Sequence, residues 1–156
     1  MVPRLSRRVA LASDHAGYAM RVALAEWLRT QGHEVEDLGP SDTAPVNYAD
    51  YGYRLARVVA GVGGLAGIAV CGSGIGISIA LNRHPGVRCA LVSDGLAARL
   101  AREHNDANVL ALGARLIGLD TAKDCVLAFL ATPFAGGRHD ARVAQLARPP
   151  FVQEPA

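Results

Sequence analysis

The 156-residue chain is poor in aromatic residues and in net charge, and both shortages limit what it can bind. Aromatic side chains make up 5% of the residues, and the formal net charge is +2. Nucleic-acid binding uses aromatic stacking platforms and basic patches, and an anionic membrane also selects for a basic excess. We therefore expect a small-molecule ligand, with neither nucleic acid nor membrane as a partner.

Cysteines are also scarce, and their spacing is uninformative about metals. The chain has three of them, Cys71, Cys89 and Cys125, with no CxxC pair. An odd number without such spacing argues against a disulfide framework and against a zinc site. The N-terminal segment lacks the apolar core of a signal peptide, and no apolar run reaches the about 20 residues of a membrane span. We expect a cytoplasmic protein with at least one free thiol.

What the chain does contain is a regular alternation of short apolar segments and longer helical patterns. The predicted strands are 8–13, 33–38, 66–71, 87–93 and 108–112. The predicted helices are 18–31, 48–62, a segment leading from the loop at 72–76 to about 83, 95–104, 119–130 and 139–146. This order predicts one α/β domain over residues 1–147, a three-layer α/β/α arrangement around a five-stranded parallel sheet. The proline-rich tail, residues 148–156, is expected to be extended or loose.

The segment CGSGIGIS, residues 71–78, follows a predicted buried strand and leads into a helix. Its glycines, Gly72, Gly74 and Gly76, allow a tight turn whose N–H groups face one point. Such a turn before a helix is typical of an anion site.

Two familiar phosphate loops fit this segment badly. A Walker A loop ends in Gly-Lys-Ser/Thr, which is absent, and a GxGxxG fingerprint needs glycine where this chain has Ile77. Asp94 does lie at about the spacing of a ribose-binding acid, so a nucleotide-binding module without catalysis stays open as an alternative.

Cys71 stands at the head of the loop. Helix N-termini and nearby cations lower the pKa of a thiol and produce the nucleophilic thiolate. A cysteine that ends a strand can equally be a small buried apolar residue, and position alone does not decide between the two. Cys89, inside an apolar strand, and Cys125, on a helix, are expected to be structural.

Other polar residues follow predicted strands or helices. Asp14 and His15 end the first strand and Arg115 follows the fifth, at the sheet edge where α/β proteins bind ligands. Asp14 could instead cap the next helix. His104 and Asn105 close the fourth helix, where a histidine can merely interact with the helix C-terminus. The cluster of Arg138 and Arg142 would, by itself, be read as a solvated surface.

Four segments in order resemble the ribose-5-phosphate isomerase B family, which also includes galactose-6-phosphate and allose-6-phosphate isomerases. The segments are SDHAG (13–17), CGSGIGISIA (71–80), REHNDANVLALGAR (102–115) and GGRHDARV (136–143), and the resemblance covers roughly residues 8–147. It implies a five-stranded Rossmann-like fold. It also implies interconversion of an aldose phosphate and a ketose phosphate without metal or cofactor.

The resemblance also implies residue roles. Cys71 would move a proton between C2 and C1, His104 would help to open the furanose ring, and Ser73 would help to shuttle the oxygen-bound proton. One branch of the family has a glutamate base in a GSGNGE pattern; Ile77 stands at that position here, which indicates the cysteine type. The implied substrate-binding residues are Asp14, His15, Tyr48, Gly72, Gly74, Ile75, Gly76, Asn105, Arg115, Arg138 and Arg142.

The expected substrate is D-ribose 5-phosphate, interconverted with D-ribulose 5-phosphate as in the non-oxidative pentose phosphate pathway. Residues 47–49 and 81–83 depart from the family pattern near the substrate mouth. Allose 6-phosphate, galactose 6-phosphate or a tetrose phosphate therefore stays open as the substrate.

Topology places the predicted catalytic residues at two different edges of the sheet. The helix that ends at His104 starts at the carboxyl edge and runs back about 15 Å, at 1.5 Å per residue. His104 should then lie at the opposite edge from Cys71, and Arg138 and Arg142 start from that far side too. We therefore expect a homodimer in which each active site takes residues from both chains. Whether dimers pair into tetramers is left open.

Overall fold

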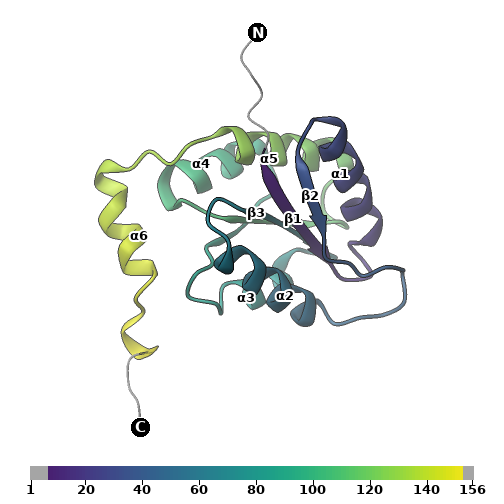
Figure 1. Cartoon of the computed structure of the whole chain (residues 1–156), viewed down its shortest axis with the longest axis horizontal. Helices are drawn as coiled ribbons and strands as arrows, with labels where there is room; N and C mark the ends of the chain where they lie inside the picture. The colour runs from purple at the N-terminus through teal and green to yellow at the C-terminus, as the bar shows by residue number, and fades with distance from the viewer. Residues whose placement is uncertain (1–6, 153–156) are drawn as a thin grey trace.

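The computed structural model describes residues 7–152, which form a three-layer α/β/α domain with a short C-terminal arm (Figure 1). Five strands make one sheet in which every described pairing is parallel, in the order β2-β1-β3-β5-β4. The predicted fold class is therefore confirmed. The strands are β1 (Arg8–Ser13), β2 (Glu34–Asp37), β3 (Ala66–Cys71), β4 (Cys89–Leu91) and β5 (Val109–Gly113).

Helices cover both faces of this sheet (Figure 1). One face carries α1 (Tyr18–Thr30), α4 (Gly95–Asn105) and α5 (Leu119–Ala131). The other face carries α2 (Tyr48–Gly61) and α3 (Ile75–Leu81). Within residues 7–152, none of the helices combines the length and the apolar character that crossing a membrane would require.

Two apolar clusters fill the space between the sheet and its helices. Met20, Leu24 and Leu28 recur at helical spacing on α1 and pack into one cluster, whereas Leu55 of α2 packs into the other. Every residue of the central strand β3 is buried. A strand covered on both faces reads as a continuous apolar run, which explains why its limits could be predicted residue for residue.

The sheet edge at β4 differs from the prediction. The strand covers three residues instead of 87–93, because it has a strand neighbour on one side only. On its other side the amide of Asn82 pairs with the backbone of Cys89, accepting from its N–H at 2.8 Å and donating to its carbonyl oxygen at 2.9 Å. The side chain of Asn82 thus occupies the place of a further strand.

Several predicted helix limits were also wrong, those of α1, α2, α4 and α5 by one residue at the C-terminal end. Helix α3 begins at Ile75, inside the expected loop, and ends at Leu81 rather than at about 83. The last helix, α6 (Asp140–Leu146), begins after a 3₁₀ turn η1 (Gly137–His139) that includes His139. In the tail, Pro150–Val152 form a 3₁₀ turn η2. Residues 1–6 of the predicted domain and 153–156 of the tail lie outside the described part.

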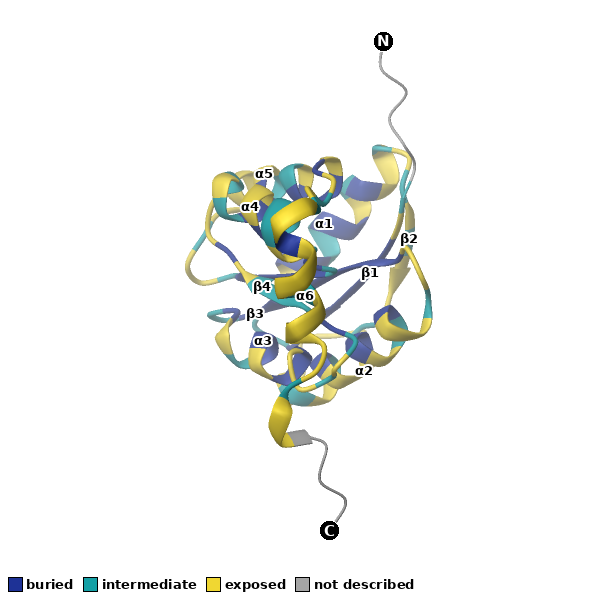
Figure 2. Ribbon diagram, turned by 90° about the vertical axis from the view of Figure 1, so that its left-hand side faces the viewer, coloured by how far each residue is buried: buried dark blue, intermediate teal, exposed yellow. Residues whose placement is uncertain are grey.

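The arm formed by α6 stands away from the domain. Figures 1 and 2 show it leaving the body at the end of α5 and running past the side where β4 lies. None of its residues is buried. The chain by itself therefore supplies little packing for this helix.

A close contact at Gly67 of β3 gives a test of the core. A Cβ atom there would lie 2.9 Å from a methyl carbon of Val59 and 2.9 Å from one of Val109. We expect Gly67→Ala to lower the free energy of unfolding by about 1–3 kcal/mol, because β-branched side chains cannot easily move aside. Urea unfolding measures the change.

Gly63→Ala is the matched control, since a Cβ at Gly63 would meet nothing within 4 Å. Equal stability of Gly67→Ala and wild type would contradict the packing described for the two apolar clusters.

Candidate active site

Three strand ends meet at the carboxyl edge of the sheet and bring three predicted site residues together. Strands β1 and β5 flank β3, so Asp14, Cys71 and Arg115 leave neighbouring strands. The N–H of Asp14 donates to the carbonyl oxygen of Val70 at 3.2 Å, and that of Arg115 donates to Gly72 at 2.9 Å. A Cβ at Gly72 would lie 3.3 Å from the Arg115 guanidinium, so the arginine side chain lies directly over the loop.

The loop itself wraps around the sulfur of Cys71. The N–H of Gly74 donates to Sγ at 3.1 Å, and the N–H of Ile75 donates to Oγ of Ser73 at 3.2 Å. Gly74 has φ +77°, and a Cβ there would lie 2.9 Å from the backbone carbon of Leu112. Only glycine fits this close left-handed turn.

The backbone N–H groups of the loop differ in whether they already have an acceptor within the chain. The N–H groups of Gly74 and Ile75 already have intramolecular acceptors. Among residues 7–152, no acceptor contacts the N–H groups of Gly72, Ser73 or Gly76. The second group is the one available to an anionic ligand.

The other two thiols and Ile77 have different surroundings: Cys89 is half-buried in strand β4, and Cys125 and Ile77 are fully buried. Burial raises the pKa of the Cys89 thiol to about 12. Burial, with the negative charges of Asp124 and Asp94, raises the pKa of Cys125 to about 11. Ile77 is fully buried in the cluster beneath α2 and α3 and offers no acid or base. Cys71 is thus the one thiol of the three at the carboxyl edge of the sheet.

Asp14 and His15 are both held by backbone contacts. Asp14 is buried, and its Oδ1 accepts from the N–H of Gly17 at 3.0 Å, so it also closes the turn before α1. The N–H of Val46 donates to Nδ1 of His15 at 3.1 Å. The carbonyl oxygen of Val46 lies 3.2 Å from the same nitrogen, so the backbone of Val46 holds the ring in either tautomer.

A shallow hollow of about 550 Å³ opens beside these two residues and also exposes Tyr48. Tyr48 is the first residue of α2, and its ring packs over the glycine loop, where a Cβ at Gly76 would lie 2.5 Å from it. The structure therefore groups Asp14, His15, Tyr48, Cys71, Ser73, the loop glycines and Arg115 at one edge.

The remaining predicted residues lie elsewhere. His104 and Asn105 are the last residues of α4, and Arg138 and Arg142 belong to η1 and α6. The ring of His104 stacks on that of His139, with centroids 4.5 Å apart. Because α4 starts at the carboxyl edge and spans 11 residues, its end lies about 16 Å back along the sheet. The predicted site is thus divided into two groups within one chain.

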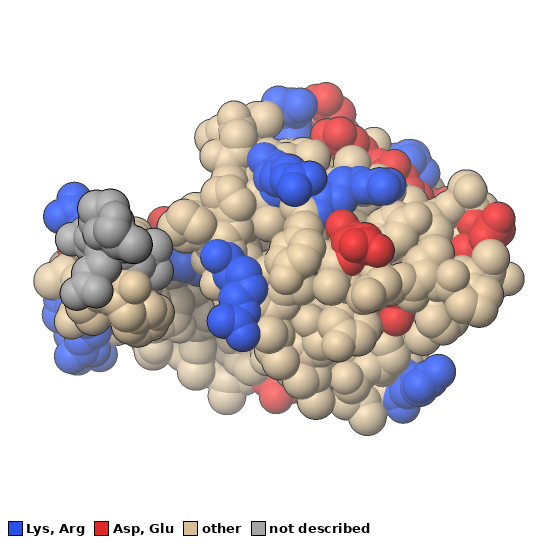
Figure 3. All heavy atoms as spheres, turned by 90° about the horizontal axis from the view of Figure 1, so that it is seen from below, with Lys and Arg blue, Asp and Glu red and all other residues tan. Residues whose placement is uncertain are grey.

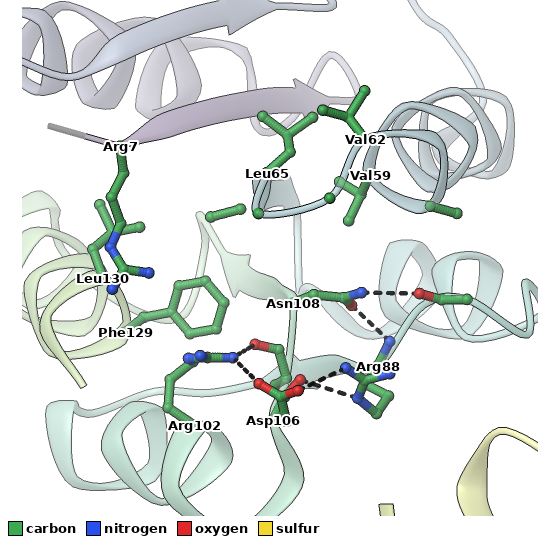
Figure 4. Close-up of a pocket in the computed structure, with 16 residues that line it drawn as sticks. Arg7, Val59, Val62, Leu65, Arg88, Arg102, Asp106, Asn108, Phe129 and Leu130 are labelled. Carbon is green, nitrogen blue, oxygen red and sulfur yellow. Dashed lines mark hydrogen bonds and ion pairs between the residues drawn. The ribbon is translucent and has the colours of Figure 1, made fainter. Parts of the chain in front are cut away.

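A cavity of about 460 Å³ lies at the amino edge of the sheet, near the end of α4 (Figure 4). Arg88 and Arg102 point toward Asp106 and form ion pairs with it at 3.2 and 2.9 Å. Asp106 has φ +45° and ends α4. The two arginines therefore brace the turn that follows His104. The sequence reasoning missed them; a signal was the i, i+4 spacing of Arg102 and Asp106.

The described residues form no metal cluster, and the face drawn in Figure 3 carries no large patch of one charge. Within residues 7–152, no three His, Cys, Asp or Glu side chains converge as metal ligands would. On the face drawn in Figure 3, basic and acidic side chains are interspersed among uncharged ones. Such a surface suits a small anion bound by a few local arginines.

Comparison with known proteins gives consistent matches along most of the chain. A sequence model of the Ribose/Galactose Isomerase family matches residues 9–146. Ribose-5-phosphate isomerase B of Escherichia coli is 40% identical over 137 residues, which cover 88% of this chain and 92% of that protein.

Solved structures are similar as well. Ribose-5-phosphate isomerase B of Clostridium thermocellum has a TM-score of 0.88 at 43% identity, covering 90% of this chain and 95% of the other. The Mycoplasma genitalium enzyme with bound ribulose-5-phosphate has a TM-score of 0.89 at 35% identity, covering 97% and 100%.

The thiol environments predict selective alkylation. At about pH 8, thiols with pKa values of about 12 and 11 are protonated and unreactive. Cys71 is itself buried, at 3% exposed, so its place at the ligand-binding edge distinguishes it rather than its exposure. We expect iodoacetamide to modify the folded chain slowly and at Cys71 only, and to modify all three cysteines rapidly after unfolding. Peptide mass spectrometry locates the adducts, with Cys71→Ala as the control. An adduct on Cys89 or Cys125 of the folded chain would contradict the assignment.

Proposed function

The chain belongs to the ribose/galactose isomerase family, and from this premise we propose that it interconverts D-ribose 5-phosphate and D-ribulose 5-phosphate. It is an aldose–ketose isomerase. The five-carbon substrate is supported by relatives named ribose-5-phosphate isomerase B and by one solved with ribulose-5-phosphate bound. The observation that carries the proposal is Cys71, whose sulfur accepts the N–H of Gly74 at 3.1 Å, with the apolar Ile77 in the helix that follows the loop.

Cys71 is the base in this proposal. Its thiolate takes the proton from C2 of the open-chain aldose, and the electrons of that C–H bond form the cis-enediolate. The same proton then returns to C1, which gives the ketose. Negative charge builds on the two substrate oxygens. The N–H groups of Gly72 and Ser73, the two residues after Cys71, have no acceptor within residues 7–152 and can donate to these oxygens. One such donor typically contributes about 10²–10³ in rate.

The remaining residues bind and prepare the substrate. His104 opens the furanose ring, because the carbonyl must form before C2 can lose a proton. Asp14, His15, Tyr48 and Asn105 orient the ring oxygen and the hydroxyls. Ser73 moves the oxygen-bound proton between O1 and O2. The phosphate is bound by Arg115, Arg138 and Arg142.

This division of roles requires two chains. Within one chain, His104, Arg138 and Arg142 belong to the group of site residues that lies away from the carboxyl edge of the sheet. Cys71 belongs to the group at that edge. Strand β4 and the helices α3 and α4 expose large apolar side chains: Ile75 and Ile79 of α3, Leu91 of β4, and Leu96 and Leu100 of α4. A hollow of about 400 Å³ separates Leu146 of the arm from β4.

We propose that a second copy covers this side, so that a two-fold dimer has two shared active sites. A cytoplasmic location is part of the proposal, supported by three unpaired cysteines.

Substrate choice is tested by comparing aldose phosphates. We expect kcat/KM to be highest for ribose 5-phosphate and lower for allose 6-phosphate, galactose 6-phosphate and erythrose 4-phosphate. Cys71→Ala should lose about 10²–10⁴ of the rate with each substrate, as removal of a general base does. A hexose phosphate preferred over ribose 5-phosphate would overturn the substrate, and an active Cys71→Ala chain would overturn the mechanism.

Shared sites predict complementation between inactive chains. Cys71→Ala and His104→Ala homodimers should both be inactive, whereas mixed dimers contain one site with both residues intact. We expect mixing, unfolding and refolding to restore about a quarter of wild-type activity, the share of intact sites under random pairing. No recovery, with hybrids shown by native mass spectrometry, would contradict shared sites.

A further inference from the structure

His139 is a buried histidine that the mechanism above does not use. It is 8% exposed, although η1 and α6 around it are largely exposed. Its ring lies nearly parallel to that of His104, with an interplanar angle of 15° and centroids 4.5 Å apart. A buried polar ring stacked on a ring with a proposed catalytic role calls for a physical explanation.

The backbone before His139 is shaped to produce this stack. Gly136 and Gly137 have φ +65° and +59°, a region that other residues rarely adopt. The N–H of Ala135 donates to the carbonyl oxygen of Glu103 at 3.1 Å, one residue before His104. Arg102 Nε donates to the carbonyl oxygen of Thr132 at 3.3 Å. The segment that leads to His139 is therefore tied to the end of α4 at two points.

The surroundings of His139 favour the neutral form of its ring. Burial, then the positive charges of His104, Arg138 and Arg142, lower the pKa of His139, while Asp140 opposes the shift. These groups come from α4, η1 and α6, the elements around the ring. Nε of Arg138 lies 3.5 Å from Nε2 of His139 and donates to it, which places the proton of the neutral ring on Nδ1.

A neutral ring is the form that suits a partner that gains and loses a proton. Two stacked imidazolium cations would repel each other, whereas a neutral aromatic face tolerates or attracts a cation above it. The stack also limits rotation of the His104 ring. Ring opening needs a nitrogen held within hydrogen-bond reach of the sugar, and a displacement of about 1 Å can cost about 10²-fold in rate.

We propose that His139 is a positioning residue for ring opening, which fixes the plane of His104 without itself touching the substrate. This inference rests on the proposed function, since it assumes that His104 opens the furanose ring. It assigns to the histidine of the GGRH segment a role distinct from phosphate binding by the neighbouring arginines.

The test separates ring opening from proton transfer by using two reactions of one enzyme. Ribose 5-phosphate is mostly a furanose and must be opened. Ribulose 5-phosphate cannot form a furanose, because its 5-hydroxyl carries the phosphate. Exchange of its C1 proton with D₂O therefore needs the base and the enediolate donors, but not ring opening.

We expect His139→Ala to lower kcat/KM for ribose 5-phosphate by about 10- to 100-fold while exchange of the C1 proton falls less than about 3-fold. His139→Phe retains a flat ring and should restore most of the isomerisation. His104→Ala should show the same selective loss as His139→Ala, and Cys71→Ala should lose both reactions. Circular dichroism and native mass spectrometry check the fold and the dimer of each variant.

Each other outcome counts against a specific claim. If His139→Ala lowers both reactions equally, or neither, the positioning role is wrong. If His139→Phe is as impaired as His139→Ala, the stacked ring is not what matters. If the wild-type chain catalyses neither reaction, the proposed function fails, and the positioning role fails with it.

Discussion

In a sheet whose strands all run the same way, every loop that follows a strand opens at one edge and every loop that follows a helix opens at the other. This polarity governs the candidate site. Asp14, Cys71 and Arg115 follow strands and meet at the carboxyl edge, whereas His104 ends a helix and cannot reach them within its own chain. The division of the site into two groups is therefore a consequence of the fold class, and two-fold symmetry is the simplest way to unite them.

The end of α4 that carries His104 is held by specific contacts, as is the loop that follows Cys71. Asp106 ends α4 in a left-handed conformation and is held there by Arg88 and Arg102. The double glycine then folds His139 against His104 from the other direction. A histidine at a frayed helix end would sample many orientations, but here the helix end is fixed on two sides. A ring held in this way suits the role that the proposed dimer gives to His104.

Much of the fold could be predicted from the sequence, because the central strands are covered on both faces and read as unbroken apolar runs. The limits of β1 and β3 matched for this reason. Strand β4 was predicted too long, because Val87 and Val92 are buried apolar residues on either side of it although they lie outside the strand. Sequence motifs identified the candidate residues. The direction of the helix that ends near His104 predicted that they lie at two edges of the sheet. The pairing of His104 with His139 could not be predicted, since it depends on two glycine dihedral angles and on a contact between residues far apart in sequence.

The arm has a consequence for how this protein folds. Helix α6 is seven residues long and buries none of its side chains within the chain. Isolated helices shorter than about 12–15 residues are marginal in water, so such a helix needs packing from outside itself. In the proposed dimer that packing comes from the second copy. Formation of helix α6 is then thermodynamically coupled to association of the two chains. The helicity of the arm depends on protein concentration for that reason.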